Sequence, residues 1–279
     1  MTISSPRLGP MKTTSDEPSL RTNNLLSADQ KQPIPSCRLE RSSSEVTKAV
    51  SKPTNKPKIP PGAKKLWMEK PNRGPLGHII TVAYLDHPPV HVGCDVEGVI
   101  RQCAEFWTRD ANIRFHILSS AADINIRRNA DIRITFEDDS EGSWSELGRN
   151  ANRNGGPTMN LAIGPQLDEK MIRRIVLHEF GHALGFEHEH ASPLSKLVFD
   201  KAECMKNTGM TDDDFEKNFK GQIGGQYLLA SSFDPDSIMM YEIPPEWNLA
   251  RIYYPLPTNL SETDKAVVKV VYHFGGTSH

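Results

Sequence analysis

Three histidines and one glutamate between residues 178 and 188 have the types and the spacing of a metal site. His178 and His182 are four residues apart, so on a helix both project from one face and can occupy two corners of a tetrahedral zinc site. Glu179 follows the first histidine, where it can reach a zinc-activated water instead of the metal. Gly185 lets the chain turn sharply, so that His188 can return as the third ligand. The fourth position stays open, which is typical of catalytic zinc and predicts one Zn²⁺ ion per chain.

A bare His-Glu-x-x-His pattern can also arise by chance on an amphipathic helix, where its histidines are ordinary half-buried residues. Here the glycine, the third histidine and the helix register fit as well. A structural zinc site needs no base and closes its fourth position, so Glu179 favours catalysis over a zinc-stabilised, non-catalytic protein-binding module. A zinc amidase acting on a small substrate is the second alternative, and it would need no strand that pairs with a substrate.

The segment Asp234-Pro-Asp-Ser-Ile-Met-Met-Tyr241 follows the histidine motif. A long histidine motif followed by a methionine turn resembles the metzincin metallopeptidases, and within them the astacin-like group of peptidases. The resemblance implies that Met239 is the methionine beneath the zinc. It implies that Tyr241 ligates zinc at rest and swings to stabilise the tetrahedral intermediate. Ordinary core packing is the alternative for both side chains.

The same resemblance implies a metalloendopeptidase that hydrolyses internal peptide bonds of protein or peptide substrates, with Glu179 as the general base. It extends over about residues 64–279. By this likeness one segment lies near the edge strand that pairs with an extended substrate and contributes substrate-binding residues, namely Thr158, Met159, Asn160 and Leu161. A plain sheet edge is compatible with the same residues.

Two further residues, Glu189 and His190, directly follow the third histidine. Glu189 matches a glutamate that pairs with the mature N-terminus in astacins, but no maturation site is evident here. An internal hydrogen bond is therefore the expected partner of Glu189. His190 is expected to lie behind the ligands or to face solvent, and not to bind the metal.

The elements that must position these residues alternate from Trp67 onward. Strands are predicted at His78–Leu85, Ile113–Leu118, Ala130–Phe136 and Thr158–Ile163. Helices are predicted from Asp95 to about Arg109, from Asp168 through Leu184, and from a capping box at Ser261 to about His273. The chain between Gly185 and Ser261 is predicted to be mostly loop. We therefore expect an α+β zincin fold of the metzincin type. Its upper lobe would hold a twisted mixed sheet and two helices, its lower lobe loops and the C-terminal helix, with the active-site cleft between them.

Residues 1–62 differ in composition from the rest of the chain. Of the first 60 residues, 24 are Ser, Thr or Pro, and none is aromatic. Such a segment cannot bury enough apolar surface to offset its ordering entropy. It is predicted to be disordered, before a metallopeptidase domain at residues 63–279. A solvated linker is favoured over an inhibitory segment acting through Cys37.

The whole chain has 279 residues, of which 37% are hydrophobic and 24% charged, and its formal net charge is −2. This composition is typical of a soluble globular protein and makes no case for nucleic acid. No run is long enough to span a membrane, and Met1 to Pro10 lacks the apolar core of a signal peptide. Four widely spaced cysteines fit a reducing compartment. A monomer with an intracellular location is favoured, and the resemblance leaves secretion open.

Overall fold

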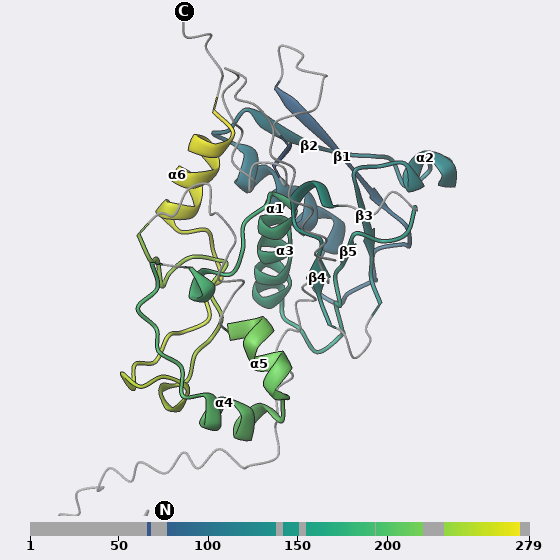
Figure 1. Ribbon diagram of the computed structural model, residues 1–279. Helices are drawn as coiled ribbons and strands as arrows, with labels where there is room; N and C mark the ends of the chain where they lie inside the picture. The colour runs from purple at the N-terminus through teal and green to yellow at the C-terminus, as the bar shows by residue number, and fades with distance from the viewer. Residues whose placement is uncertain are drawn as a thin grey trace, which may run out of the picture. The chain divides into compact units, whose positions relative to one another are not determined.

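The computed structural model describes residues 66–67, 77–137, 142–150, 155–192, 194–219 and 232–273. The segment predicted to be disordered, residues 1–62, and its boundary at residue 63 lie outside these ranges. Strands and helices alternate as far as the long helix α3, and helices and loops follow it (Figure 1). The α+β class predicted from the sequence is confirmed.

Five strands form one mixed sheet in the order β2-β1-β3-β5-β4. The strands are β1 His78–Tyr84, β2 Ile113–Ile117, β3 Ile132–Thr135, β4 Trp144–Ser145 and β5 Met159–Asn160. Neighbours are parallel except β4, which runs antiparallel to β5. All four predicted strands are present, and each is shorter than predicted, β5 most of all. The sheet therefore has β4, a strand too short to predict, at the edge beyond β5.

Three helices begin where the sequence predicts them. They are α1 Val96–Thr108, α3 Glu169–Ala183 and α6 Glu262–Val271. Asp95 and Asp168 each accept a hydrogen bond from a backbone N–H in the first turn, and Ser261 forms the predicted capping box with Asp264. Such caps satisfy N–H groups that have no partner within the helix. A further short helix, α2, covers Ile124–Arg128.

Helices α1 and α3 pack together over the sheet and share its apolar core. The fully buried Trp107 of α1 stacks on Phe186, with ring centroids 5.4 Å apart. Its indole N–H also donates to the carbonyl of Leu177, at 2.8 Å. At the far end of α3, the carbonyls of Ala183 and Leu184 accept hydrogen bonds from Trp67 and Tyr272. The half of α3 that carries the histidines is therefore held from its middle to its C-terminal end.

In its described part, the region between Gly185 and Ser261 is mostly loop, as predicted, but it also contains two short helices that were not predicted. It holds α4 Lys201–Thr208 and α5 Asp212–Phe219. Both helices have only eight residues, too few to be stable alone, and packing around the buried Cys204, Phe215 and Phe219 stabilises them. Asp200 caps α4, and Gly209 ends it with a left-handed φ of 74°. These two residues were the signal in the sequence.

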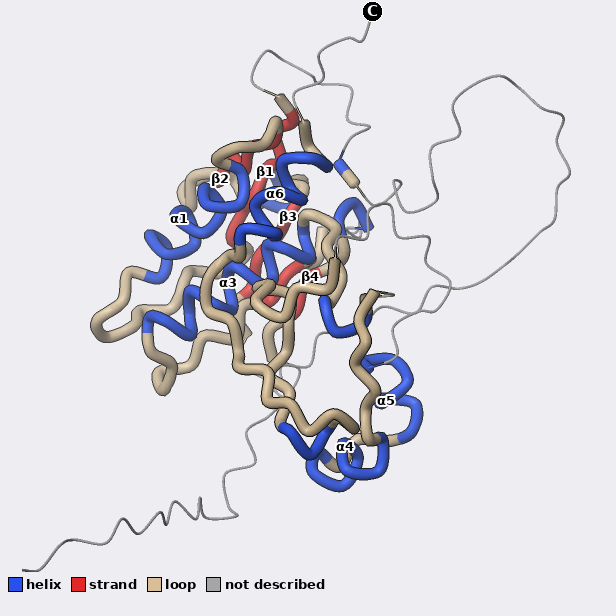
Figure 2. The backbone as a smooth tube through the Cα atoms, turned by 90° about the vertical axis from the view of Figure 1, so that its left-hand side faces the viewer, coloured by secondary structure: helices blue, strands red, loops and turns tan. Residues whose placement is uncertain are grey.

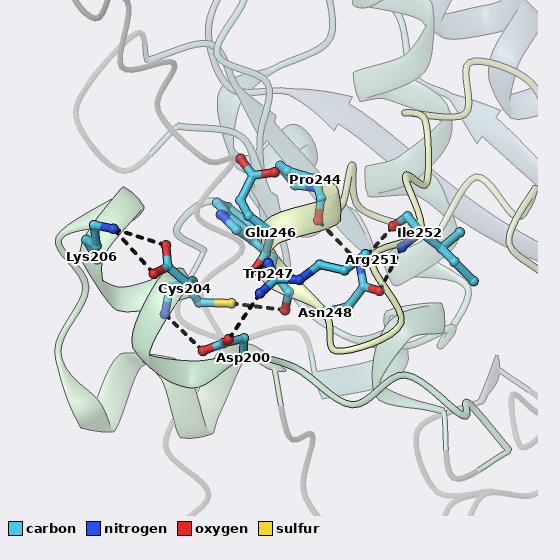
Figure 3. Close-up of polar contacts among 10 residues, drawn as sticks. Asp200, Cys204, Lys206, Pro244, Glu246, Trp247, Asn248, Arg251 and Ile252 are labelled. Carbon is cyan, nitrogen blue, oxygen red and sulfur yellow. Dashed lines mark hydrogen bonds and ion pairs between the residues drawn. The ribbon is translucent and has the colours of Figure 1, made fainter.

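Helices α4 and α5 lie together at one end of the domain, away from β1 and α6 (Figures 1 and 2). Figure 3 shows the polar contacts that fix a neighbouring loop to α4. The buried Asn248 amide donates to the carbonyls of Pro244, at 3.3 Å, and Ile252, at 2.7 Å. The backbone N–H of Asp200 donates to the carbonyl of Trp247, at 2.8 Å.

Among the residues described, no helix has both the length and the apolar character that crossing a membrane requires.

Candidate active site

His178, Glu179 and His182 lie on the C-terminal half of α3, and all three side chains are buried. The helix ends in a Schellman motif at Gly185, whose φ is 97°. Its N–H donates to the carbonyl of His182, at 2.8 Å, and the N–H of Phe186 donates to that of Gly181, at 3.0 Å. This arrangement needs a residue that tolerates a left-handed backbone. The predicted stop at Gly185 is confirmed, and the turn brings the following chain back toward the helix.

The turn brings His188 to the two histidines of α3. The ligand nitrogens of the three residues all lie within 4.8 Å of one another, and they form a group that could hold a metal ion. The Nε2 atoms of His182 and His188 are 3.1 Å apart. Two ligand nitrogens about 2.0–2.1 Å from a tetrahedral zinc ion would be about 3.3 Å apart, so this spacing fits zinc.

Backbone carbonyls orient the two histidines of α3. Nδ1 of His178 lies 2.8 Å from the carbonyl oxygen of Ile238, and Nδ1 of His182 lies 2.8 Å from that of Phe186. A carbonyl oxygen only accepts, so Nδ1 carries the proton in both rings and Nε2 keeps its lone pair. Nε2 of His178 is buried and has no hydrogen-bond partner among the described residues. These lone pairs are suited to a metal ion.

Burial keeps the three imidazoles neutral. It lowers the pKa of His182 to about 4 and holds the pKa values of His178 and His188 well below the ordinary value. The positive charge of Arg174 lowers all three further. Because zinc binds neutral imidazole, the ligand set is ready for the metal at neutral pH.

The methionine turn runs beneath α3 and is tied to it through its carbonyl oxygens. The carbonyl of Ile238 accepts from His178, as described above, and that of Met239 accepts from the N–H of Glu189, at 3.1 Å. The carbonyl of Met240 accepts from the guanidinium of Arg174, at 3.4 Å. Arg174 lies one helical turn before His178, and this i, i+4 spacing was a signal that sequence reasoning missed.

From below, Asp264 of α6 holds the same turn. Its carboxylate accepts from the N–H of Ile238, at 2.8 Å, and from the hydroxyl of Ser237, at 2.7 Å. Burial raises the pKa of this carboxyl, although the hydrogen bonds it accepts oppose that shift. The sequence predicted a capping box here, but it did not predict that Asp264 also reaches the turn. Asp264 thus acts on His178 through the position of Ile238.

Met239 lies directly against Gly181 of α3, so closely that a β-carbon on Gly181 would meet the Met239 sulfur. Tyr241 is also buried, and its ring centroid lies 4.4 Å from that of His188 and 6.1 Å from that of His178. The fold therefore brings the three histidines and Tyr241 together, with Met239 against α3 and Glu179 buried on the same helix. The roles of Glu179, Met239 and Tyr241 in catalysis stay predictions.

The two residues after His188 are both placed inside the protein. Glu189 accepts a hydrogen bond from the N–H of Asp234, at 3.0 Å. This is an internal hydrogen bond of the kind predicted for Glu189. Burial raises the pKa of Glu189 to about 7. His190 is only 3% exposed, so it does not face solvent, and it lies outside the metal-binding group.

The predicted substrate-binding residues lie inside the sheet and not at its edge. Strand β5, which includes Met159 and Asn160, is paired with β3 on one side and β4 on the other. Thr158 donates its N–H to Arg133, and Leu161 donates to Thr135. These backbone groups are already used, so they cannot pair with a peptide. The pairing of β5 on both sides corrects the predicted role of these residues. Strand β4, and not β5, forms the edge of the sheet.

A mixed sheet above a histidine-bearing helix, with a third histidine and a methionine turn below, defines the metzincin class of zinc metallopeptidases. The family model for the astacin peptidases matches residues 91–245, which is more than half of the chain. The chain belongs to the astacin family, and its domain is a zinc metalloendopeptidase domain. Zinc is the cofactor that the group of His178, His182 and His188 fits.

Three known proteins illustrate the similarity. Zinc metalloproteinase nas-39 of Caenorhabditis elegans is 36% identical over 108 residues, which are 39% of this chain and 10% of that protein. Protein SpAN of Strongylocentrotus purpuratus is 29% identical over 96 residues, which are 34% of this chain and 14% of that protein. A structure of myroilysin is 29% identical, has a TM-score of 0.60, and matches over 73% of this chain and 96% of its own.

The chain spans 10% and 14% of the length of the two curated relatives. The activity, substrates and partners of the whole protein are therefore proposals. Neither relative supports the intracellular location that the sequence favoured.

Proposed function

We propose that this protein hydrolyses internal peptide bonds of protein or peptide substrates, as a monomer with one zinc ion. The observation that carries the proposal is the convergence of three neutral, buried imidazoles beside Glu179. Glu179 directly follows the first of these histidines on α3 and is buried beside them. A carboxylate in this place is suited to act as a general base.

Zinc held by the three histidines supplies Lewis-acid chemistry, which activates water and polarises a peptide carbonyl. In the proposed reaction, Glu179 takes a proton from the attacking water as the new carbon–oxygen bond forms. It then passes this proton to the leaving amine as the carbon–nitrogen bond breaks. The phenol of Tyr241 donates a hydrogen bond to the developing oxyanion, a contribution of about 10²–10³ in kcat where such donors have been removed.

The proposed substrate lies along the outer edge of the sheet. Strand β4 pairs with β5 through Trp144 and Ser145, and α3 contacts it. An extended peptide that adds to β4 as a further strand would pass over the histidines of α3. If so, N-methylation of single backbone amides in a cleaved peptide should raise KM about tenfold at paired positions, because each methyl group removes one hydrogen bond. Equal KM values for all methylated peptides would rule out strand addition.

The proposal is tested with wild type and Glu179→Ala, by metal analysis and by cleavage of a peptide library. We expect about one zinc ion per chain in both proteins and cleavage by wild type alone. Zinc-loaded wild type that cleaves no peptide would favour a protein-binding module. Cleavage confined to small amides would favour an amidase, and absence of metal from both proteins would contradict the zinc site.

A further inference from the structure

Three aromatic rings pack together beside the metal site. The ring of Tyr241 lies 4.4 Å from that of His188, the third metal ligand, and 4.6 Å from that of His190, with interplanar angles of 46° and 28°. The rings of His188 and His190 are also stacked, with centroids 5.3 Å apart, so each ring contacts the other two. His190 belongs to no metal group in the described part of the chain.

His190 is itself held by contacts with α5 and with neighbouring aromatic residues. Its Nε2 lies 2.6 Å from the backbone carbonyl of Asn218 in α5, so Nε2 carries the proton and donates. Phe219 and Phe199 lie against the same ring, with centroids 5.7 Å and 6.0 Å away. The orientation of His190 is thus set by α5 and by the aromatic cluster beneath it.

We propose that His190 is a positioning residue that holds the ring of Tyr241 against His188. This rests on the proposed role of Tyr241 as the oxyanion donor. A hydrogen-bond donor accelerates a reaction only if it is already in place when charge develops. The imidazole of His190 limits where the phenol ring can go, and so it keeps the donor near the reacting carbonyl.

Beside His190 lies a cavity of about 260 Å³, which is also lined by Ser192, Ser195, Phe199 and Phe219. Removal of the imidazole would join its volume to this cavity. The ring of Tyr241 would then lose its contact with the ring of His190 and gain room to shift away from His188. Truncation at His190 should therefore impair catalysis without removing a metal ligand.

Two variants separate the ring of His190 from its hydrogen bond. His190→Phe keeps an aromatic ring and loses the donor to Asn218, and His190→Gln keeps a donor and loses the ring. We expect kcat to fall about tenfold in His190→Gln and His190→Ala, with KM within twofold of wild type, and to fall less than threefold in His190→Phe. Phe215→Leu is the matched control, since Phe215 lines the same cavity but does not contact the ring of Tyr241. It should lower the melting temperature and leave kcat within twofold.

The decisive measurement repeats His190→Ala in a Tyr241→Phe background. If His190 acts through the phenol, its removal should change kcat less than twofold there. A second readout is the affinity for a phosphinic peptide, a transition-state mimic, which His190→Ala should weaken about tenfold at unchanged zinc content.

Equal losses of kcat in both backgrounds would overturn the inference and leave the peptidase proposal standing. Unchanged kcat and phosphinic affinity in His190→Ala would do the same. A Tyr241→Phe variant as active as wild type would remove the role of Tyr241 and, with it, that of His190. Wild type without peptidase activity would instead contradict the proposed function itself.

Discussion

The third histidine reaches the metal site only because the chain turns back after α3. With His188 replaced by alanine, two ligands would remain on one helix face, and the Nε2 atom of His182 would lose its neighbour at 3.1 Å. We expect His188→Ala to hold less than a tenth of the zinc of wild type after dialysis and to cleave no peptide. Metal analysis after dialysis measures this. The control is His116→Ala, since His116 is exposed on β2 and should keep full zinc content.

At the scale of elements, the contact between α3 and the methionine turn depends on the absence of a side chain at Gly181. In Gly181→Ala, the new methyl group would meet Met239 and Trp107. Alanine favours a helix over glycine by about 1 kcal/mol, and overpacking in a filled core costs about 1–3 kcal/mol. We expect a net loss of stability, measured by urea unfolding, together with faster loss of zinc to a chelator.

The matched control for Gly181→Ala is Gly156→Ala. A β-carbon at Gly156 would meet nothing within 4 Å, and its φ is outside the left-handed region. This change should be neutral or stabilise the protein by about 0.4–1 kcal/mol. If Gly181→Ala were as stable as Gly156→Ala and lost zinc to a chelator at the rate of wild type, the contact with Met239 would affect neither stability nor zinc binding.

The start of α6 supports the metal site from below, through a carboxylate that only accepts hydrogen bonds. Asp264→Asn would replace one acceptor oxygen with a donor and so lose a bond from either Ile238 or Ser237. We expect a loss of about 1–3 kcal/mol in stability, and an affinity for zinc that is about 10–100 times weaker, because Ile238 orients His178. Zinc titration with a competing chelator measures the second effect. Unchanged affinity would mean that the turn keeps its place without Asp264, and the exposed Asp236→Asn is the control.

At the scale of the whole molecule, buried neutral acids predict how stability changes at high pH. Burial raises the pKa of the Cys103 thiol to about 12 and raises the pKa values of Tyr84 and Tyr272. Above about pH 9 the unfolded chain releases the thiol proton while the folded protein keeps it. Stability should be fully present below pH 9 and fall as pH rises toward 12, by up to about 1.4 kcal/mol per pH unit for each such group.

Urea unfolding between pH 7 and pH 10.5 tests this dependence. Cys103→Ala removes one titrating group, so its stability should fall less steeply above pH 9 than that of wild type, although it is less stable at pH 7. Parallel profiles for the two proteins would show that the Cys103 thiol ionises as readily in the folded state as in the unfolded one.

Local patterns were enough to predict the elements that carry the site. The cap at Asp168, the apolar face of α3 and the stop at Gly185 are all short-range features, and each predicted a boundary that the structure has. Helices α4 and α5 were not predicted because their stability comes from tertiary contacts, such as that between the rings of Phe219 and Trp247. Strand β4 was not predicted because a strand of two residues is too short to show an alternating pattern of apolar and polar residues.

By itself, the sequence determined the zinc chemistry and the helix that presents it, since ligand spacing and helix signals are set within a dozen residues. The residues predicted for the catalytic centre from resemblance also came together in space. Only the tertiary structure decided which strand forms the edge of the sheet, because pairing on both sides of β5 depends on segments distant in sequence. The same holds for the reach of Asp264 to the methionine turn and for the place of His190 beside Tyr241 and His188. Such contacts join elements whose separation in sequence says nothing about their distance in the fold.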